Sequence, residues 1–287
     1  MKVIRAGTLG FCKGVRRAVE LAVKAIEAAD RRVYTLGPLI HNHRVLEDLR
    51  LRGVEVLEDR ALPPAPERAA VIIRAHGAPP QKEDELRALG VLVIDATCPK
   101  VKASQLKARA LAKKGFFIFL AGEEHHAELA GIRGYAESAG GLCRIVGSAA
   151  EAEAAARELG EAKAGAALIG QTTITAEEFR TIGEGIKKHY PDLKIINTIC
   201  EATRERQDSL RELCAGVGGV IIAGDRQSAN TRRLEDIAVN LGKPARLVEA
   251  AGDITREVGS WGTAGLCAGT STPDGVIDEI EKALEAL

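Results

Sequence analysis

The sequence lacks the features that mark several common classes of protein. Its 287 residues contain equal numbers of basic and acidic side chains, so the formal net charge is zero. Broad binding to nucleic acid or to anionic membranes needs an excess of positive charge, and we expect neither here. A local basic pocket for a small anion is still compatible with this balance.

No apolar run approaches the roughly 20 residues that a helix needs to cross a bilayer. The N-terminal segment 1–10 has the pattern of a short strand, without the apolar stretch of a secretory signal peptide. We therefore expect a soluble, cytoplasmic protein. In that compartment its six cysteines are expected to be thiols, metal ligands or catalytic groups rather than disulfides.

The cysteines also lack any Cys-x-x-Cys pair, which disfavours zinc ribbons and ferredoxin-like runs. Cys143 and Cys267 fall in strand patterns and Cys214 in a helix pattern, where a cysteine is most simply a small buried apolar residue. The other three share one kind of position, because each follows a short apolar strand and precedes a helix. These three are Cys12, Cys98 and Cys200.

Strands and helices alternate along the chain in three rounds of similar length, and the three cysteines mark the rounds. The third round lacks a last strand and a cysteine, which the N-terminal strand Lys2–Arg5 and Cys12 would supply. Self-similarity of this kind predicts a repeat architecture. Alternating strands and helices predict parallel sheets with right-handed crossovers.

The predicted fold is therefore α/β, with three pseudo-threefold-related units whose parallel sheets surround a central site. We assign residues 1–12 to an N-terminal strand that completes the third unit, 13–97 to the first unit, 98–195 to the second and 196–287 to the third. Ligands of parallel α/β sheets bind beyond the carboxyl ends of the strands, where each unit has polar loops beside its cysteine. The polar side chains in these loops are His41, Asn42, His76, His126, Glu128, Thr172, Ser228, Asn230 and Ser271.

Three thiolates at one point suit two kinds of metal group. Zinc would take the three sulfurs and one further ligand, whereas an iron–sulfur cluster would keep one iron open. Each cysteine taken alone is also explained as a small buried residue at a strand–helix turn.

The polar loop residues have simpler explanations when they are taken singly. His41 and His76 lie beside Gly/Pro turns and would serve as hydrogen-bonding loop residues. Ser228, Asn230 and Ser271 would cap the helices that follow them. A capped helix start also binds phosphate, so capping and binding are compatible. In the run 123–128 we expect a solvated loop in which only the side chains of residues 126 and 128 point inward.

Eight short motifs occur in order along the whole chain and form a specific combination. They are Gly10-Phe11-Cys12-Lys13-Gly14-Val15, His41-Asn42, Ala75-His76-Gly77, Asp95-Ala96-Thr97-Cys98-Pro99, Gln171-Thr172-Thr173, Cys200 with Ala202-Thr203, Ser228-Ala229-Asn230 and Ala268-Gly269-Thr270-Ser271-Thr272-Pro273-Asp274. This set resembles the LytB/IspH family of 4-hydroxy-3-methylbut-2-enyl diphosphate reductases. The resemblance implies three α/β domains around an iron–sulfur cluster. It also implies the last step of non-mevalonate isoprenoid biosynthesis, an oxidoreductase reaction that dehydroxylates this substrate to isopentenyl and dimethylallyl diphosphate.

The resemblance further implies roles for single residues. It makes Cys12, Cys98 and Cys200 the metal ligands of a 4Fe–4S cluster with one open iron. It assigns catalysis to Glu128, Thr172 and His126, with Glu128 delivering a proton. It assigns substrate binding to His41, His76, His126, Thr172, Ser228, Asn230 and Ser271.

Two positions depart from the family pattern, because Ala127 stands where proline is common and Ala229 where serine is common. The sequence has no nicotinamide or flavin fingerprint, so electrons are expected from a partner such as ferredoxin or flavodoxin. Two alternative functions stay open at this point. One is a zinc-dependent phosphate-ester hydrolase, and the other is a non-catalytic iron–sulfur redox-sensing module.

Overall fold

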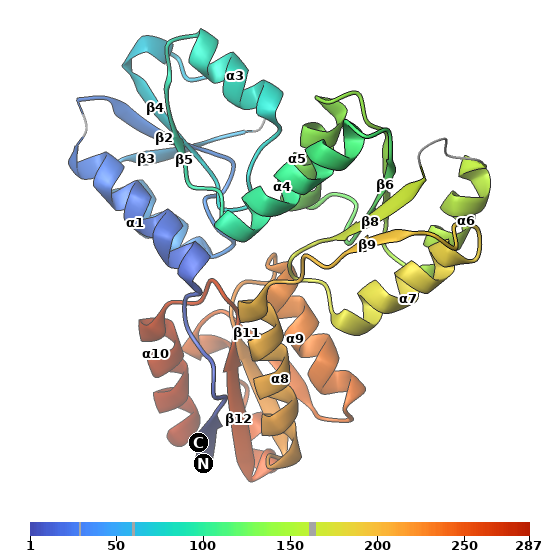
Figure 1. The fold of residues 1–287 in the computed structure, drawn as a ribbon. Coiled ribbons are helices and arrows are strands. Elements are labelled where there is room, and N and C mark those ends of the chain that lie inside the picture. Colours follow the sequence, from blue (N-terminus) through green and yellow to red (C-terminus); the bar gives the residue numbers. More distant parts are fainter. Residues whose placement is uncertain (29, 59–60, 161–164) are drawn as a thin grey trace. The chain divides into compact units, whose positions relative to one another are not determined.

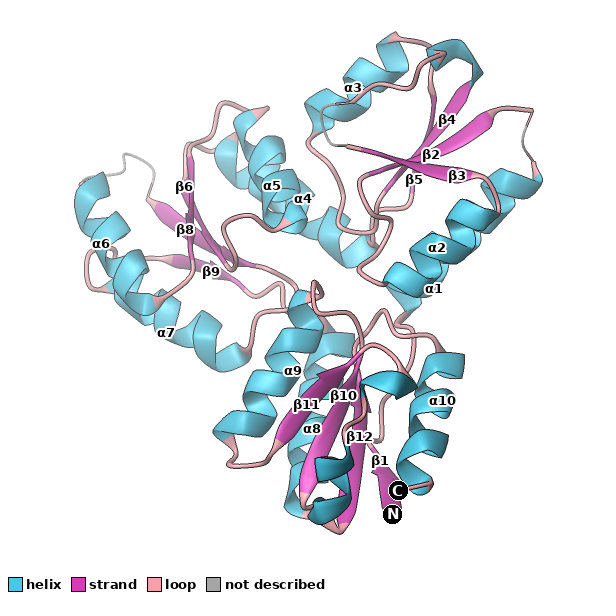
Figure 2. Cartoon of the chain, turned by 180° about the vertical axis from the view of Figure 1, so that it is seen from behind, coloured by secondary structure: helices cyan, strands magenta, loops and turns pink. Residues whose placement is uncertain are grey.

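The computed structural model describes residues 1–28, 30–58, 61–160 and 165–287. Within these ranges, the strands form three four-stranded parallel sheets with helices packed against them (Figures 1 and 2). The prediction of an α/β fold with three parallel sheets is confirmed. The arrangement of the sheets around a central site stays a prediction.

The three sheets share one strand order, which reads β3-β2-β4-β5, β7-β6-β8-β9 and β11-β10-β12-β1. In each round, the first strand (β2, β6 or β10) lies between the second, at an edge, and the third, which pairs with the fourth. The fourth strand of the last sheet is β1 (Lys2–Arg5), which pairs in parallel with β12 (Thr263–Ala268). The N-terminal strand thus occupies the place that the third round of the sequence lacks.

The first of these sheets is built around β4, whose five residues are all buried. A strand covered on both faces needs apolar side chains at every position, which is the pattern of the run Val71–Ile73. Leu86 of α3 packs against Tyr34 and Val71 in the core of this sheet. The elements of this part of the chain are α1 (Lys13–Glu27), β2 (Arg32–Leu36), α2 (His43–Leu51), β3 (Val54–Leu57), β4 (Ala69–Ile73), α3 (Pro80–Ala88) and β5 (Leu92–Asp95).

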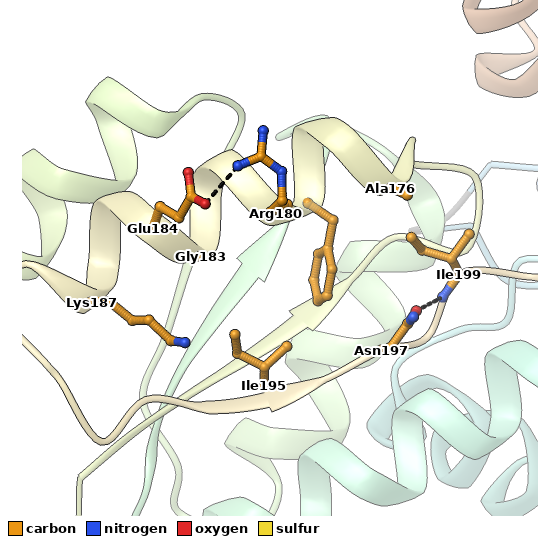
Figure 3. A pocket seen from close by; sticks show the side chains of 9 residues that line it. Ala176, Arg180, Gly183, Glu184, Lys187, Ile195, Asn197 and Ile199 are labelled. Carbon is orange, nitrogen blue, oxygen red and sulfur yellow. Dashed lines mark hydrogen bonds and ion pairs between the residues drawn. The ribbon is translucent and has the colours of Figure 1, made fainter.

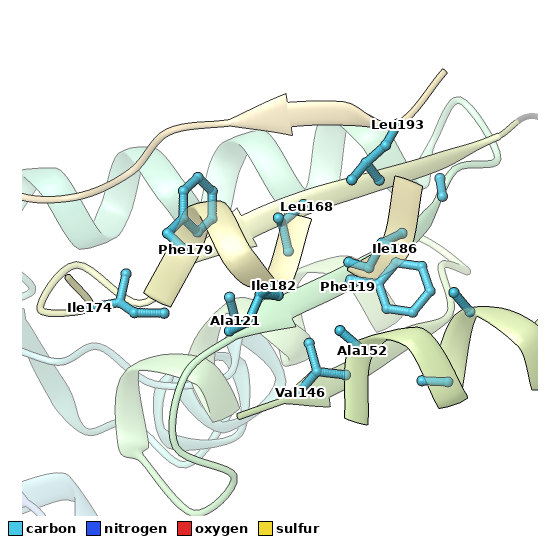
Figure 4. Packing of buried hydrophobic residues seen from close by; sticks show 13 residues of the cluster. Phe119, Ala121, Val146, Ala152, Leu168, Ile174, Phe179, Ile182, Ile186 and Leu193 are labelled. Carbon is cyan, nitrogen blue, oxygen red and sulfur yellow. The ribbon is translucent and has the colours of Figure 1, made fainter. Parts of the chain in front are cut away.

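The second sheet shows how a strand divides its side chains between two faces. Phe119 of β6 packs with Ile182 and Ile186 of α7 on one face (Figure 4). Its neighbour Ile118 points to the other face, with Ile132 of α5, because successive residues of a strand point to opposite faces. The elements are α4 (Pro99–Ala112), β6 (Phe117–Ala121), α5 (Ala127–Glu137), β7 (Cys143–Val146), α6 (Ala149–Leu159), β8 (Ala166–Gly170), α7 (Ala176–Lys187) and β9 (Lys194–Ile196).

The third sheet is covered in the same way. Leu210 of α8 and Leu234 of α9 pack on one face of β10, while Ile277 and Ile280 of α10 pack on the other. The elements are α8 (Glu201–Ala215), β10 (Gly219–Ala223), α9 (Ala229–Asn240), β11 (Ala245–Val248), β12 (Thr263–Ala268) and α10 (Asp274–Glu285). Three short 3-10 helices complete the described elements, at Pro66–Arg68, Ala251–Asp253 and Arg256–Trp261.

The chain divides into two compact bodies. The first body comprises Met1–Arg16, Ile40–Asp48 and Cys200–Leu287, and the second comprises Arg17–Leu39 and Leu49–Ile199. The division into units at residues 12/13, 97/98 and 195/196 stays a prediction. Among the described residues, no helix combines the length and the apolar character that crossing a membrane requires.

Candidate functional site

Each of the three cysteines stands at the start of a helix. Cys98 and Cys200 are the N-cap residues of α4 and α8, and Cys12 directly precedes α1. The amide of Val15 in the first turn of α1 donates a hydrogen bond to Cys12 Sγ at 3.4 Å. Free N–H groups and the helix dipole at such positions favour negative charge. These three sulfurs therefore suit the role of thiolate ligands.

The other three cysteines lie within strands or a helix rather than at helix starts. Burial raises the pKa of Cys143 and of Cys267 to about 12, and it also raises the pKa of Cys214. Cys143 lies in β7, Cys267 in β12 and Cys214 in α8, as the strand and helix patterns indicated. All three therefore stay neutral thiols near neutral pH.

The turn that precedes each cysteine helix is hydrogen-bonded to the end of a neighbouring strand. The bonds are Cys12 N to Thr270 O at 3.0 Å, Cys98 N to Ala75 O at 2.9 Å, and Gly170 N to Thr198 Oγ1 at 3.0 Å. In the first body this places the Cys12 turn next to Ser271. In the second body it places the Cys98 turn next to His76. Each cysteine turn is therefore joined to a loop that carries a predicted substrate-binding residue, the first two through the N–H of the cysteine and the third through the hydroxyl of Thr198.

Glu128 and Thr172 form a pair inside the second body. Glu128 is only 1% exposed and lies in the first turn of α5. Its Oε1 accepts a hydrogen bond from Thr172 N at 2.6 Å, and its Oε2 accepts one from Thr172 Oγ1 at 2.7 Å. Thr172 follows β8, so two loops that are far apart in sequence present one connected carboxyl and hydroxyl.

His126 is fixed beside this pair. It is the N-cap of α5, and its Nδ1 accepts a hydrogen bond from Glu128 N at 3.2 Å. The acceptor role of Nδ1 assigns a proton to Nε2 in the neutral ring. The rings of His126 and His76 meet edge to face, with centroids 5.3 Å apart. His125 is exposed, which agrees with the expectation that only residues 126 and 128 of this loop point inward.

In the first body, the loops of His41, Ser228 and Ser271 are joined by hydrogen bonds. Ser271 Oγ donates to His41 O at 2.8 Å. Asp225 accepts from His43 N at 3.1 Å and from Gln227 N at 2.7 Å, which joins the His41 loop to the Ser228 loop. His43 Nδ1 also lies 3.6 Å from Glu249 Oε2. The side chains of His43, Asp225 and Glu249 therefore form a cluster that stabilises these loops.

Three residues were expected to cap helices, and the structure shows one of them in that role. Ser228 caps α9, since Oγ accepts a hydrogen bond from Thr231 N at 3.4 Å. Ser271 instead donates to a carbonyl, and the N-cap of α10 is Pro273. Asn230 lies inside α9, is 2% exposed, and neither its Oδ1 nor its Nδ2 has a hydrogen-bond partner among the described residues. Helix starts favour anions, and this amide keeps a donor available there.

Asn42, next to His41, has a structural role. It is buried, and its Oδ1 accepts a hydrogen bond from Val45 N at 3.1 Å. This bond satisfies one of the free amides at the start of α2. The carbonyl of Asn42 also accepts from Leu46 N at 3.1 Å. Asn42 therefore orients the loop that presents His41.

One groove lies apart from the candidate residues of the second body. It has a volume of about 280 Å³ and runs between α7 and β9 (Figure 3). Phe179, Ile195 and Ile199 supply its apolar surface, and Arg180 at its rim pairs with Glu184 at 2.6 Å. None of the predicted catalytic, substrate-binding or metal-binding side chains lines it.

Gly10 shapes the turn before Cys12. Its φ of +73° lies in the left-handed region, and a Cβ at this position would collide with Asp274 Oδ1. We expect Gly10→Ala to destabilise the fold by more than the roughly 1–2 kcal/mol of the backbone term alone, measured by urea unfolding. The matched control is Gly275→Ala in α10, where a Cβ meets nothing within 4 Å. Equal stability of the two variants would contradict this account of the turn.

Two arginines near the cysteine turns were not singled out from the sequence. In the first body, Arg206 of α8 donates to Gly10 O at 2.6 Å. In the second body, Arg17 donates to the carbonyls of Thr97 at 3.2 Å and Asp95 at 3.1 Å. A signal for Arg206 was available, since it falls at the helical spacing of the buried residues of α8. A charged residue on an otherwise inward face indicates a specific buried partner.

The turn before Cys98 is further fixed by charge. Asp95 Oδ1 accepts from Thr97 N at 2.9 Å, and Lys102 Nζ lies 2.9 Å from Asp95 Oδ2. Burial works to raise the pKa of Asp95, but the hydrogen bonds from Thr97 and Lys102 outweigh it and hold that pKa below its ordinary value. Asp95 is therefore a fixed anion that orients the Cys98 turn through its bond to Thr97.

Similarity to known proteins extends over nearly the whole chain. The family model described as LytB protein matches residues 3–285. A curated relative from Treponema denticola is 44% identical over 99% of this chain and 99% of its own length. One from Aquifex aeolicus is 36% identical over 99% of this chain and 96% of its own length. Both relatives are named 4-hydroxy-3-methylbut-2-enyl diphosphate reductase.

Solved structures agree with these relatives. A structure of (E)-4-hydroxy-3-methyl-but-2-enyl diphosphate reductase, described as the terminal enzyme of the non-mevalonate pathway, is 36% identical over the full length of both chains, with a TM-score of 0.72. The E-1-hydroxy-2-methyl-but-2-enyl-4-diphosphate reductase from Plasmodium falciparum has a TM-score of 0.90 over 98% of this chain and 87% of that chain. At 24% identity this second likeness concerns the fold alone. With a family model and relatives that span it almost from end to end, the chain belongs to the LytB protein family.

Proposed function

We propose that this protein is a 4-hydroxy-3-methylbut-2-enyl diphosphate reductase, the terminal enzyme of the non-mevalonate pathway. It removes the allylic hydroxyl of its substrate as water and yields isopentenyl or dimethylallyl diphosphate. The observation that carries the proposal is the buried Glu128–Thr172 pair. It occurs in a chain that matches a relative of this name over 99% of both lengths. The proposal includes a cytoplasmic location and electrons from a partner such as ferredoxin or flavodoxin.

The proposed cofactor is a 4Fe–4S cluster held by Cys12, Cys98 and Cys200. The residues fit such a group, because each sulfur stands at a helix start and Val15 N–H points at Cys12 Sγ. Hydrogen bonds to the sulfurs help to set the reduction potential of an iron–sulfur cluster. When bound, the cluster supplies single electrons and one open iron that attracts the hydroxyl oxygen of the substrate.

Glu128 is proposed to deliver the proton that turns the departing hydroxyl into water. A protonated carboxyl at this position donates to Thr172 Oγ1, and that hydroxyl can pass its own proton to the substrate oxygen. Both groups are buried and already within hydrogen-bond distance, so only the hydroxyl hydrogen of Thr172, which is donated to Glu128 in the structure, has to turn before the transfer. The reaction consumes two electrons and two protons: one proton leaves with the oxygen as water, and the other is added to carbon.

The diphosphate is assigned to His41, His76, Ser228, Asn230 and Ser271. Helix starts, hydroxyls and histidines suit an anion in a protein without net charge. In the first body, the support for this assignment is the start of α9, where the amide of Asn230 is buried and has no partner among the described residues. A phosphate oxygen would satisfy Nδ2, which is a donor.

Asn230→Ala separates a ligand-binding amide from a structural one. We expect weaker substrate binding by about 10- to 100-fold, because a hydrogen bond to a charged group contributes roughly 1.5–3 kcal/mol. We expect no loss of thermal stability in the ligand-free protein, because the deleted amide has no partner there. Titration calorimetry and thermal unfolding measure the two effects. Asn240→Ala, at the exposed end of the same helix, is the control and should change neither.

An anaerobic turnover assay tests the proposed activity. The protein, reconstituted with iron and sulfide and reduced by dithionite with a viologen mediator, should convert 4-hydroxy-3-methylbut-2-enyl diphosphate to isopentenyl and dimethylallyl diphosphate. Release of inorganic phosphate by a zinc-loaded, colourless protein would instead support a hydrolase. A bound cluster without any turnover would support a redox-sensing module.

A further inference from the structure

Arg206 is a buried cation that forms no hydrogen bond to a carboxylate in the described part of the chain. It lies in α8, the helix that Cys200 caps, and it is only 2% exposed. Among the described residues its hydrogen bonds go to three carbonyls alone. These are Ala202 O at 2.9 Å, Gly10 O at 2.6 Å and Leu9 O at 3.4 Å. A guanidinium stays charged in proteins, and a buried charge is normally neutralised by a nearby opposite charge.

The guanidinium also keeps one donor free. The Nε of Arg206 is buried and has no hydrogen-bond partner among the described residues. Burial lowers the pKa of Arg206, and the groups that act against this include Cys12, Cys267 and Cys200. Of these, Cys267 is a neutral thiol with a pKa of about 12. Glu205 also acts against the lowering but is exposed on α8, so the less exposed groups left to balance Arg206 in the first body are Cys12 and Cys200.

We infer that Arg206 is the positioning residue and the fixed counter-charge for the part of the cluster that Cys12 and Cys200 hold. This inference rests on the proposed iron–sulfur site. Arg206 lies in the helix that Cys200 caps, and it donates hydrogen bonds to the carbonyls of Leu9 and Gly10, shortly before Cys12. One planar guanidinium therefore ties the turn before Cys12 to the helix that Cys200 caps, and in this way positions two of the three sulfurs.

The charge of Arg206 has a consequence for reduction. Adding an electron makes a cluster and its thiolates more negative, and a nearby positive charge stabilises that state. Arg206 therefore raises the reduction potential and makes the cluster easier to reduce. Its hydrogen bonds to Gly10 and Leu9 have a separate effect, because they hold the Cys12 turn and slow the loss of iron.

Two substitutions separate these effects. Arg206→Gln removes the charge and the paired donors. Arg206→Lys keeps the charge but replaces the planar fork by a single ammonium group. The matched control is Arg211→Gln on the same helix, since Arg211 is exposed and pairs with Asp208 at 3.0 Å.

The test uses the anaerobically reconstituted full chain and measures two quantities. A dye-mediated redox titration followed by absorbance gives the midpoint potential, and transfer of iron to a chelator gives the rate of cluster loss. For Arg206→Gln we expect the reduced-to-oxidised ratio at the wild-type midpoint to fall by about tenfold, which is 59 mV for one electron. We also expect iron loss to be several-fold faster. Arg206→Lys should keep the wild-type potential but lose iron faster, and Arg211→Gln should match the wild type in both.

Wild-type potential and wild-type iron retention in Arg206→Gln would overturn the inference. If that variant does not fold, as judged by circular dichroism, Arg206→Lys decides, and iron retention equal to the wild type would overturn the positioning role. A wild-type protein that takes up no cluster would overturn the proposed function itself. The failure of the inference and the failure of the function are therefore distinguishable.

Discussion

Cys98→Ser is expected to remove the cluster and the activity together. Serine has the same shape at the N-cap of α4, and its hydroxyl is a good N-cap acceptor, so the helix should form as before. A hydroxyl is a poor ligand for iron compared with a thiolate, which is the ligand that holds such clusters. We therefore expect a folded protein without the broad visible absorbance of a cluster and without turnover.

The control for this substitution is Cys143→Ser. Cys143 lies in β7, and burial raises the pKa of its thiol to about 12, so it is not expected to bind iron. Iron content, visible absorbance and activity are measured for both variants after the same anaerobic reconstitution. An unchanged iron content in Cys98→Ser would remove Cys98 from the ligand set.

The second large effect is expected for Glu128→Gln. Glutamine keeps the shape of the side chain, and its two terminal atoms can still accept from Thr172 N and donate to Thr172 Oγ1. It cannot carry a transferable proton. We therefore expect KM within a few-fold of the wild type and a fall in kcat of about 10²–10⁴-fold, the usual contribution of a general acid.

This split between kcat and KM tells a proton donor from a packing residue. A merely structural Glu128 would change substrate binding and thermal stability along with kcat. Glu184→Gln, which removes an exposed carboxylate paired with Arg180, is the control and should leave both constants unchanged. Full turnover by Glu128→Gln would exclude Glu128 from the proton path.

Much of the fold follows from patterns that are local in sequence. Each central strand is an apolar run, such as Val71–Ile73, because it is buried on both faces. Two helices begin earlier than the apolar pattern of the sequence indicates. The apolar periodicity indicates starts at Val101 and Thr203, whereas α4 and α8 begin at Pro99 and Glu201. Proline is favoured in the first turn of a helix, so α4 begins at Pro99 and Cys98 becomes its N-cap.

The site was only partly predictable. Residue types and their positions after strands identified Glu128 and Thr172, and the structure joins them by two hydrogen bonds. Neither the free amide of Asn230 nor the bond from Ser271 to His41 O follows from the sequence, since both depend on loops that come together only in the folded chain. The helical spacing places Arg206 on the buried face of α8, but its partners Gly10 and Leu9 lie at the other end of the chain and do not follow from the sequence.

The iron and acid-labile sulfide content of the anaerobically purified wild-type protein tests the central claim most directly. A site with three thiolates and one open iron should bind about four iron and four sulfide atoms per chain, with a brown colour that is lost in air. A colourless protein that contains stoichiometric zinc and no sulfide would contradict the account.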